Sequence, residues 1–194
     1  MKVIVKNIAT VFNEFLKIER AVIQYEKFDG TMTDDVIRLN MNRGNSVAAL
    51  LFDPYKKSVI MIRQFRYPAF SNNKKEGWLL EIVAGVVENG HDPKKTIIKE
   101  IYEEVGYEVH NVDHILTFYT SPGGSSEKVF LYFAEIHEEL KIADGGGLDS
   151  ETEDIQIVEI PLKDALNLLD SNVIIDAKTI IALQWLKNNR NLNK

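Results

Sequence analysis

The sequence predicts an α/β protein in which a mixed β-sheet lies between helices. Continuous apolar runs of strand length occur at residues 45–52, 58–63 and 78–83. Runs of this kind are typical of strands that are covered on both faces. Segments with helical character follow them, at residues 93–105, 162–169 and 176–186. Strands interrupted by a few helices indicate a layered architecture in which the helices pack on the sheet.

The strands can be followed in order along the chain. A first section, residues 1–40, contains strand-like patches and a turn at Asp29-Gly30. The apolar run that begins at Asn45 is broken by Asp53-Pro54 and then resumes, which predicts two neighbouring strands joined by a turn. Two later apolar runs predict further strands, at residues 129–134 and 154–160.

Both ends of the helix at residues 93–105 are marked in the sequence. Asp92 can accept hydrogen bonds from the first free amide groups, and Pro93 suits the first helical position because it has no amide hydrogen to leave unpaired. Gly106 can adopt the left-handed conformation that ends a helix. The apolar side chains fall on one face of this helix, at Ile97, Ile98, Ile101 and Val105. This face is expected to pack on the sheet.

The composition excludes several classes of protein. Cysteine is absent, which rules out disulfides, thiolate nucleophiles and cysteine-based zinc sites. The net charge of −6 argues against broad nucleic-acid binding. No apolar run approaches the roughly 20 residues of a membrane span, and residues 1–7 lack the apolar core of a signal peptide. We therefore expect a cytoplasmic protein with neither a nucleic acid nor a membrane as its partner.

Three carboxylates, Glu100, Glu103 and Glu104, crowd the last turns of the same helix. The C-terminal end of a helix disfavours a carboxylate by roughly 0.3–1 kcal/mol, and carboxylates three and four residues apart repel one another. A solvated acidic face is the ordinary interpretation of such a pattern. Glu100 and Glu104, however, lie at the edge of the apolar face, where a cation would offset the repulsion. Oxygen ligands of this kind suit hard ions such as Mg²⁺.

These carboxylates belong to a longer pattern that resembles a known family. Gly85, Glu100, Glu103, Glu104 and Gly106 fall where the Nudix box has its glycine, its glutamate-rich helix and its closing glycine. Segments outside the box resemble the nucleoside-diphosphate-sugar hydrolases of the Nudix superfamily, namely residues 43–45, 62–66, 80–85, 121–124 and 151–154. The resemblance covers about residues 40–186.

The resemblance implies a Nudix-type α/β/α sandwich with a mixed β-sheet and an N-terminal β extension. Residues 1–42 would form the extension, residues 43–187 the Nudix hydrolase domain and residues 188–194 a C-terminal tail. In the family the N-terminal section exchanges between subunits and helps to build the substrate site, so a homodimer is expected.

The resemblance also implies an activity. The chain is expected to hydrolyse the pyrophosphate bond of a nucleoside diphosphate sugar to a nucleoside monophosphate and a sugar phosphate, with GDP-mannose or ADP-ribose as the favoured substrates. Such a linkage is anionic and resists attack, and Mg²⁺, or Mn²⁺ in its place, can neutralise its oxygens and activate water. The expected metal ligands are the carbonyl of Ala84 and the carboxylates of Glu100, Glu104 and Glu153. Glu151 is expected to be the catalytic base, and Glu103 and Glu104 to assist catalysis.

Further residues are expected to bind substrate because they match ligand-binding positions of the family: Arg66, Glu127, Gly85, Lys178, Arg38 and Phe15. Cations near the pyrophosphate would offset its charge. Glu127 has an alternative interpretation as a surface carboxylate on a turn, and Phe15 as a core aromatic rather than one that stacks on the base. Arg38 is expected to reach the ligand across a subunit boundary.

The sequence departs from the Nudix box at two positions, with His91 where the box usually has glutamate and Lys99 where it usually has arginine. Two alternatives therefore stay open: a Nudix module that binds a sugar nucleotide without cleaving it, and a Nudix enzyme for another nucleoside diphosphate derivative. The choice of substrate is also open. Lys99 favours the GDP-mannose branch, whereas residues 80–85 and 181–186 resemble the ADP-ribose branch more closely.

Overall fold

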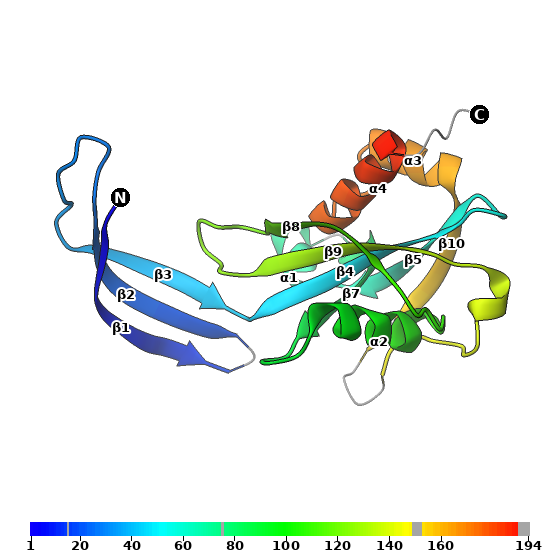
Figure 1. The fold of residues 1–194 in the computed structure, drawn as a ribbon, viewed down its shortest axis with the longest axis horizontal. Coiled ribbons are helices and arrows are strands. Elements are labelled where there is room, and N and C mark those ends of the chain that lie inside the picture. Colours follow the sequence, from blue (N-terminus) through cyan, green and yellow to red (C-terminus); the bar gives the residue numbers. More distant parts are fainter. Residues whose placement is uncertain (15, 75, 149–152, 190–194) are drawn as a thin grey trace. The chain divides into compact units, whose positions relative to one another are not determined.

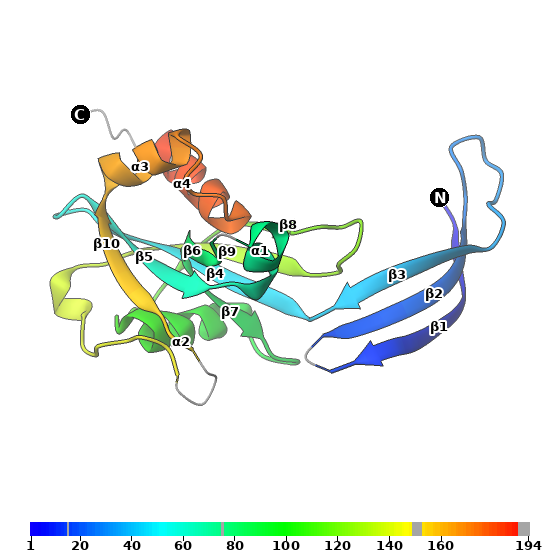
Figure 2. The same ribbon diagram turned by 180° about the vertical axis from the view of Figure 1, so that it is seen from behind.

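The computed structural model describes residues 1–14, 16–74, 76–148 and 153–189, and the chain divides into two compact units (Figures 1 and 2). The first unit contains residues 1–45 and 118–128, and the second contains the rest of the described chain. The elements are β1 (Val3–Asn13), β2 (Lys17–Tyr25), β3 (Val36–Asn42), β4 (Asn45–Asp53), β5 (Ser58–Phe65), α1 (Tyr67–Asn73), β6 (Trp78–Glu81), β7 (Val83–Val87), α2 (Pro93–Val105), β8 (Asp113–Tyr119), β9 (Lys128–Glu135), a 3₁₀ turn (Glu138–Leu140), β10 (Gln156–Pro161), α3 (Leu162–Asp170) and α4 (Ala177–Asn189).

The first unit is built on a three-stranded antiparallel sheet in the order β1-β2-β3. Val3 pairs with Tyr25 at one end of the β1–β2 ladder, and Ile23 pairs with Val36 across β2 and β3. Every residue of β1 is exposed, whereas β2 is half-buried along its whole length. The predicted N-terminal β extension is therefore present. Its predicted boundary at residue 42 and that of the following domain at residue 187 stay predictions.

The second unit contains a seven-stranded sheet in which five strands follow the order β10-β5-β4-β9-β8, while β6 pairs with β5 and β7 pairs with β4. Strand β4 runs parallel to β9, from Ser46 beside Val129 to Phe52 beside Glu135. Strand β5 is antiparallel to β4, β6 and β10. The sheet is therefore mixed, as the sequence predicted.

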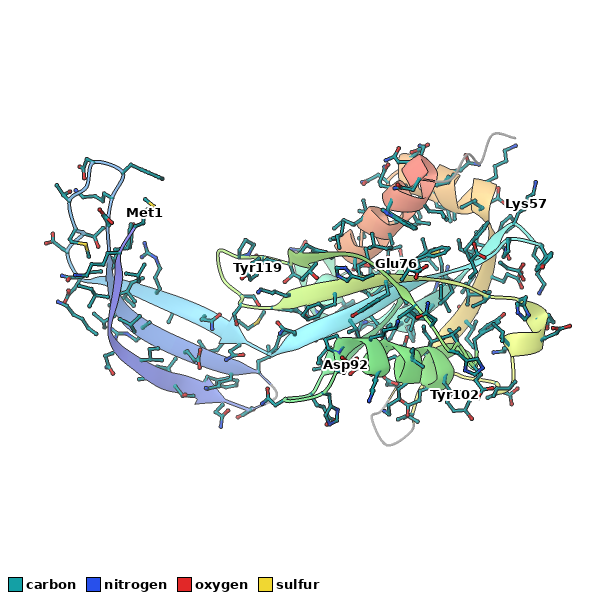
Figure 3. The ribbon with its side chains drawn as sticks, viewed as in Figure 1. Met1, Lys57, Glu76, Asp92, Tyr102 and Tyr119 are labelled. Atoms are coloured by element: carbon teal, nitrogen blue, oxygen red, sulfur yellow. The ribbon has the colours of Figure 1, made fainter. Side chains whose placement is uncertain are left out.

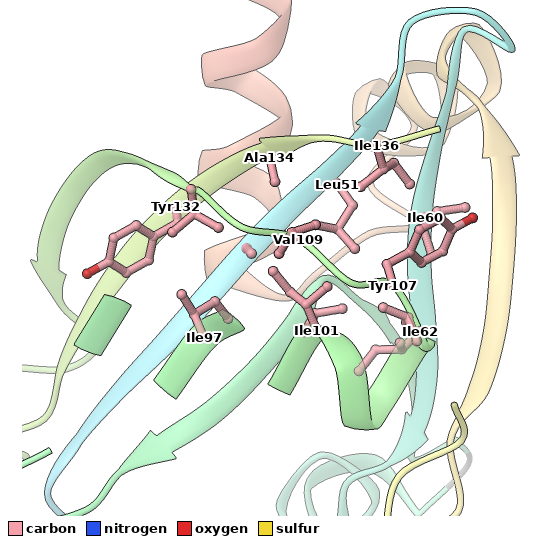
Figure 4. Close-up of a cluster of buried hydrophobic side chains, with 14 of the residues drawn as sticks. Leu51, Ile60, Ile62, Ile97, Ile101, Tyr107, Val109, Tyr132, Ala134 and Ile136 are labelled. Carbon is pink, nitrogen blue, oxygen red and sulfur yellow. The ribbon is translucent and has the colours of Figure 1, made fainter. Parts of the chain in front are cut away.

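Helices cover both faces of this sheet, with α2 on one side and α3 and α4 on the other (Figures 1 and 2). The central strand β4 is buried from Val47 to its end, which agrees with the prediction of strands covered on both faces. Ile97 and Ile101 of α2 join the buried cluster on the first face (Figure 4). On the other face, the ring of Trp185 in α4 lies 5.3 Å from that of Phe133. Because each buried side chain of this size stabilises the fold by roughly 1.5–3 kcal/mol, α2 is held mainly by its apolar face.

The ends of α2 form as the sequence predicted. The side chain of Asp92, at the start of the helix in Figure 3, accepts a hydrogen bond from the Lys95 amide at 2.9 Å. Gly106 has φ of 72° at the C-terminal end, and its amide donates to the Tyr102 carbonyl at 2.9 Å. Lys141 Nζ donates to the Val105 carbonyl at 2.6 Å, which places a cation at the negative end of the helix.

Within the described residues, no helix is both long and apolar enough to cross a membrane.

Replacing Gly106 with alanine is expected to destabilise the second unit. A Cβ atom there would lie 2.0 Å from the Ala143 carbonyl oxygen, and the residue has positive φ. Backbone strain alone costs on the order of 1–3 kcal/mol, and the clash adds to it. The free energy of unfolding, measured by chemical denaturation, should fall by at least this amount. Gly123→Ala is the control, because no heavy atom lies within 4 Å of its added Cβ; equal stability of the two variants would contradict the prediction.

Candidate active site

Glu104 and Glu100 lie where helix α2 faces strand β7. Glu104 is only 1% exposed, and its Oε2 accepts a hydrogen bond from the Ala84 amide at 3.2 Å. Glu100 lies against Gly85, because a Cβ atom on this glycine would be 2.1 Å from Glu100 Oε1. A side chain at position 85 would displace the Glu100 carboxylate. The structure thus brings together Ala84, Gly85, Glu100 and Glu104.

Glu104 is more deeply buried than its sequence position suggested. Periodicity placed it at the edge of the apolar face, but the adjoining loop at residues 145–147 also covers this end of the helix. The amide of Gly146 donates to the Glu104 carbonyl at 2.9 Å, and the amide of Gly147 donates to the Glu103 carbonyl at 3.2 Å. These backbone contacts fix the loop against α2.

The same loop positions Glu153. Its Oε2 accepts a hydrogen bond from the Leu148 amide at 3.1 Å. A Cβ atom on Gly147, which has φ of 86°, would lie 2.7 Å from Glu153 Cβ. Glycine at position 147 therefore lets the chain pass close to this carboxylate, which joins the neighbourhood of Glu104 from a distant part of the sequence.

The surroundings of Glu104 oppose its negative charge. Burial raises the pKa of Glu104 well above 4.5, and the charges of Glu100 and Glu153 raise the pKa further. The Ala84 amide and the charge of Arg66 act in the opposite direction without cancelling this rise in pKa. Since the repulsion comes from three carboxylates, a divalent cation would favour their ionised forms.

The oxygen ligands fit a divalent metal by their chemistry. Three carboxylates and the Ala84 carbonyl are the hard oxygen ligands that Mg²⁺ prefers. In the described part of the chain, however, no group of three or more His, Cys, Asp or Glu side chains converges closely enough to hold an ion. Two of the carboxylates instead accept hydrogen bonds from the chain itself, Glu104 from Ala84 and Glu153 from Leu148.

Arg66 and Lys178, both expected to bind substrate, meet at one buried carboxylate. Arg66 forms two parallel hydrogen bonds to Glu81, from Nε to Oε1 at 2.9 Å and from NH2 to Oε2 at 3.0 Å. Lys178 Nζ also donates to Glu81 Oε2, and to Asp176 Oδ1 at 3.0 Å. The charge of Arg66 acts on Glu104. Arg66 therefore lies within electrostatic reach of the carboxylate cluster.

Glu103 lies further out on α2. It is half-buried, and its carboxylate forms an ion pair with Lys99 Nζ at 2.6 Å. A cavity of about 460 Å³ opens beside this part of the helix and is lined by Glu100, Lys99, Lys95 and His91 among others. Lysines beside a metal-binding carboxylate can offset the charge of a phosphorylated ligand.

Two other expected substrate residues belong to the first unit. Glu127 is buried, accepts a hydrogen bond from Thr120 Oγ1 at 3.3 Å, and lies 3.5 Å from Arg43 Nε. It is therefore not the surface carboxylate of the alternative interpretation. Arg38 is exposed, and its NH1 donates to the Ile37 carbonyl at 2.9 Å.

Glu151 and Phe15 lie outside the described residues, so their expected roles stay predictions.

Sequence reasoning missed Glu81 and Thr179 as site residues. Glu81 is the one charged residue in the apolar run at residues 78–83, and a carboxylate buried in such a run needs charged partners. Thr179 is fully buried; its Oγ1 accepts from the Ile82 amide at 3.0 Å and donates to Asp176 at 2.5 Å. A lone threonine in a helix carried no signal of this contact.

Removing the charge of Glu104 should stabilise the metal-free protein at high pH. Because the pKa of Glu104 is higher in the folded than in the unfolded state, stability is lost as the pH rises from 4.5 through the folded-state value. Glu104→Gln abolishes this loss. At about pH 8 the free energy of unfolding of Glu104→Gln should exceed that of the wild type. The difference should be on the order of 1.4 kcal/mol for each unit by which folding raises the pKa of Glu104.

Differential scanning calorimetry with a chelator, over a series of pH values, would measure this difference. Glu103→Gln serves as the control, since Glu103 is less buried and paired with Lys99. A Glu104→Gln protein that is less stable than the wild type at high pH would contradict the prediction.

The chain is similar to known proteins over most of its length. Residues 42–183 match the family described as NUDIX domain. A GDP-mannose pyrophosphatase of Cronobacter sakazakii is 36% identical over 185 residues, which is 93% of this chain and 95% of the relative. One of Salmonella typhimurium is 38% identical over 146 residues, 75% of each chain. A crystal structure of an ADP compounds hydrolase superposes with a TM-score of 0.74 at 20% identity, covering 99% of this chain and 98% of the other. The chain therefore belongs to the Nudix family.

Proposed function

We propose that this chain is a Mg²⁺-dependent Nudix hydrolase that cleaves the pyrophosphate bond of a nucleoside diphosphate sugar. The products are a nucleoside monophosphate and a sugar phosphate. One observation carries the proposal: the buried Glu104 accepts a hydrogen bond from the Ala84 amide at 3.2 Å, beside Glu100, whose carboxylate lies against Gly85. Burial and the charges of Glu100 and Glu153 raise the pKa of Glu104, and the charge of Arg66 lowers it. Such a site needs a cation for its carboxylates and offers cationic side chains to an anionic substrate.

The metal-binding residues of the proposal are Glu100, Glu104, Glu153 and the carbonyl of Ala84. Bound Mg²⁺ would supply Lewis-acid polarisation of the phosphoryl oxygens and an acidified water. The protein contributes the positions of its ligands: Gly85 leaves room for Glu100, and the glycine loop brings Glu153 close.

The remaining steps belong to side chains. Arg66 and Lys178 neutralise the diphosphate, and Glu151 accepts the proton of the attacking water while the bridging P–O bond breaks. Glu103 keeps Lys99 beside the site through their ion pair. Glu127, Arg38, Gly85 and Phe15 complete the proposed substrate contacts.

The departure at position 99 is compatible with an enzyme. Lys99 retains a positive charge and pairs with Glu103 at 2.6 Å, so the Nudix-box helix still has a cation at this position. Relatives at 36% and 38% identity are named pyrophosphatases, which favours hydrolysis over a module that only binds a sugar nucleotide.

GDP-mannose is the first candidate substrate, because relatives at 36% and 38% identity are named GDP-mannose pyrophosphatase. ADP-ribose is the second, on the resemblance of residues 80–85 and 181–186 to that branch. We place the enzyme in the cytoplasm on the ground that its sequence has no cysteine to form disulfides.

A homodimer is also part of the proposal. All of β1 is exposed, and it carries apolar side chains that include Val5, Ile8 and Phe12. Apolar surface of this kind, next to an edge strand, favours association with another chain. A second copy of this chain is the proposed occupant.

Phosphorus NMR is expected to show conversion of GDP-mannose to GMP and mannose 1-phosphate in the presence of Mg²⁺. Parallel reactions contain ADP-ribose or UDP-glucose, so the same measurement also compares substrates. Folded protein that cleaves none of them with Mg²⁺ or Mn²⁺ would refute the proposed activity and favour the binding module.

Glu104→Gln should retain the fold but reduce turnover by roughly 10³-fold or more at saturating Mg²⁺, because it removes a metal ligand whose charge the reaction needs. Glu108→Gln, an exposed residue beyond the end of α2, is the matched control. Unchanged turnover of Glu104→Gln would exclude Glu104 from the metal site.

The dimer is tested by light scattering coupled to size-exclusion chromatography, which should give twice the chain mass of 22.1 kDa. Ile8→Glu is expected to shift the protein towards the monomer, since it puts a charge on the apolar strand. Lys6→Gln, on the same strand, should leave the mass unchanged. A wild-type protein that is monomeric at micromolar concentration contradicts this part of the proposal.

A further inference from the structure

Glu81 is a buried carboxylate to which neither the resemblance nor the comparisons give a role. It ends β6, is 1% exposed, and is three residues before Ala84. Three hydrogen bonds from two cations reach it: two from Arg66 and one from Lys178. Arg66 follows β5 and Lys178 lies in the first turn of α4, so Glu81 links the end of β6 to two distant parts of the chain.

Arg66 and Lys178 can stay close to each other because the carboxylate of Glu81 lies between their charged groups. Two like charges that share a partly buried position repel each other, and the repulsion is strong where water is excluded. Glu81 reduces this repulsion through a bidentate bond to the guanidinium and a bond to the ammonium group. Asp176 holds Lys178 from the other side at 3.0 Å. Arg66 and Lys178 are thus fixed by acidic side chains before any anionic ligand is present.

The network is also attached to the strand that carries the proposed metal site. Asp176 accepts hydrogen bonds from the Thr179 amide at 3.0 Å and hydroxyl at 2.5 Å. The Thr179 hydroxyl oxygen in turn accepts from the Ile82 amide at 3.0 Å. Ile82 lies between Glu81 and the β7 strand that contains Ala84 and Gly85. The start of α4, and Lys178 with it, is therefore fixed relative to the backbone of β7.

Arg66 retains donors for a ligand. A guanidinium group has five N–H donors, and within the described residues two of them bond to Glu81. The remaining donors belong to a side chain whose charge acts on both Glu81 and Glu104. Arg66 therefore interacts electrostatically with both the buried acceptor Glu81 and Glu104.

We infer that Glu81 is a positioning residue for the reaction: it holds Arg66 and Lys178 as a preorganised pair that grips the diphosphate. This inference rests on the proposed function. Glu81 does not contact the substrate itself; it acts through the two cations. A purely structural ion pair is the competing interpretation, and it predicts a loss of stability without a change in substrate affinity.

Steady-state kinetics of Glu81→Gln separate the two interpretations. The amide keeps the size of the side chain but removes its charge, so the cations separate and the diphosphate binds less well. We expect kcat/KM to fall by roughly 10²-fold, mainly through a higher KM. Glu81→Asp retains the charge and should fold even if Glu81→Gln does not; its shorter side chain cannot reach both cations, so its KM should also rise.

A double-mutant cycle tests whether Glu81 acts through Lys178. Lys178→Met should reduce kcat/KM strongly in the wild type and much less in the Glu81→Gln background, because the cation is already displaced there. Asp53→Asn is the matched control: Asp53 is also a buried carboxylate in the second unit, but it accepts hydrogen bonds from the Tyr55 and Lys56 amides in the β4–β5 turn. Asp53→Asn should lower the free energy of unfolding and leave KM unchanged.

Two results would overturn the inference: a KM that is unchanged in both Glu81 variants, or effects of Glu81→Gln and Lys178→Met that multiply independently. If the wild type cleaves no nucleotide sugar, the proposed function fails separately. Calorimetric binding of a methylene-bridged analogue of GDP-mannose then decides the role of Glu81. Weaker binding of the analogue by the Glu81 variants than by the wild type supports the positioning role of Glu81. Equal binding by variants and wild type, or no binding by the wild type, rejects that role.

Discussion

The arrangement of the site depends on one carboxyl group, that of Glu104, in a buried position that disfavours its negative charge. Glu104 lies beneath β7 and the glycine loop, near the end of a helix whose dipole already disfavours anions, and Glu100 and Glu153 add their repulsion. The fold tolerates this arrangement because the apolar face of α2 is deeply packed. Packing energy thus offsets the cost of placing Glu104 in a buried position near other carboxylates.

The cationic side of the site follows the opposite principle. Arg66 and Lys178 are neutralised by Glu81 and Asp176 within the protein, so their positions are fixed without a ligand. Preorganised charges need little rearrangement when an anion arrives, which is the main source of electrostatic stabilisation in enzymes. At Glu104, by contrast, burial and the charges of Glu100 and Glu153 raise the pKa of the carboxyl more than the Ala84 amide and the charge of Arg66 lower it. The carboxylate cluster therefore requires a cation, whereas the Arg66–Lys178 pair is in place for an anion before any ligand binds.

The sequence predicted most of the fold because its signals were local. Apolar runs identified the central strands, and Asp92, Pro93 and Gly106 marked both ends of α2 within the bounds found in the structure. Helix α1 escaped prediction because it has only 7 residues and no capping side chain. The carboxylates of the box were also visible, since their spacing is set by one helix. Glu81 was not singled out, because its partners are the residue that follows β5 and a residue of α4, and tertiary contacts of this kind leave no periodic trace in a single sequence.

The parallel pairing of β4 with β9 has a consequence for the folding of the chain. Ser46 lies beside Val129, and the whole of β5 to β8, with α2, intervenes between them. Closing so long a loop is entropically costly and slows folding. During synthesis, β4 and α2 leave the ribosome well before β9, so the most buried strand waits with its apolar edge unpaired. An unpaired strand edge on a partly folded chain is a site where aggregation can begin, so the distance between β4 and β9 along the sequence sets how long this edge stays exposed.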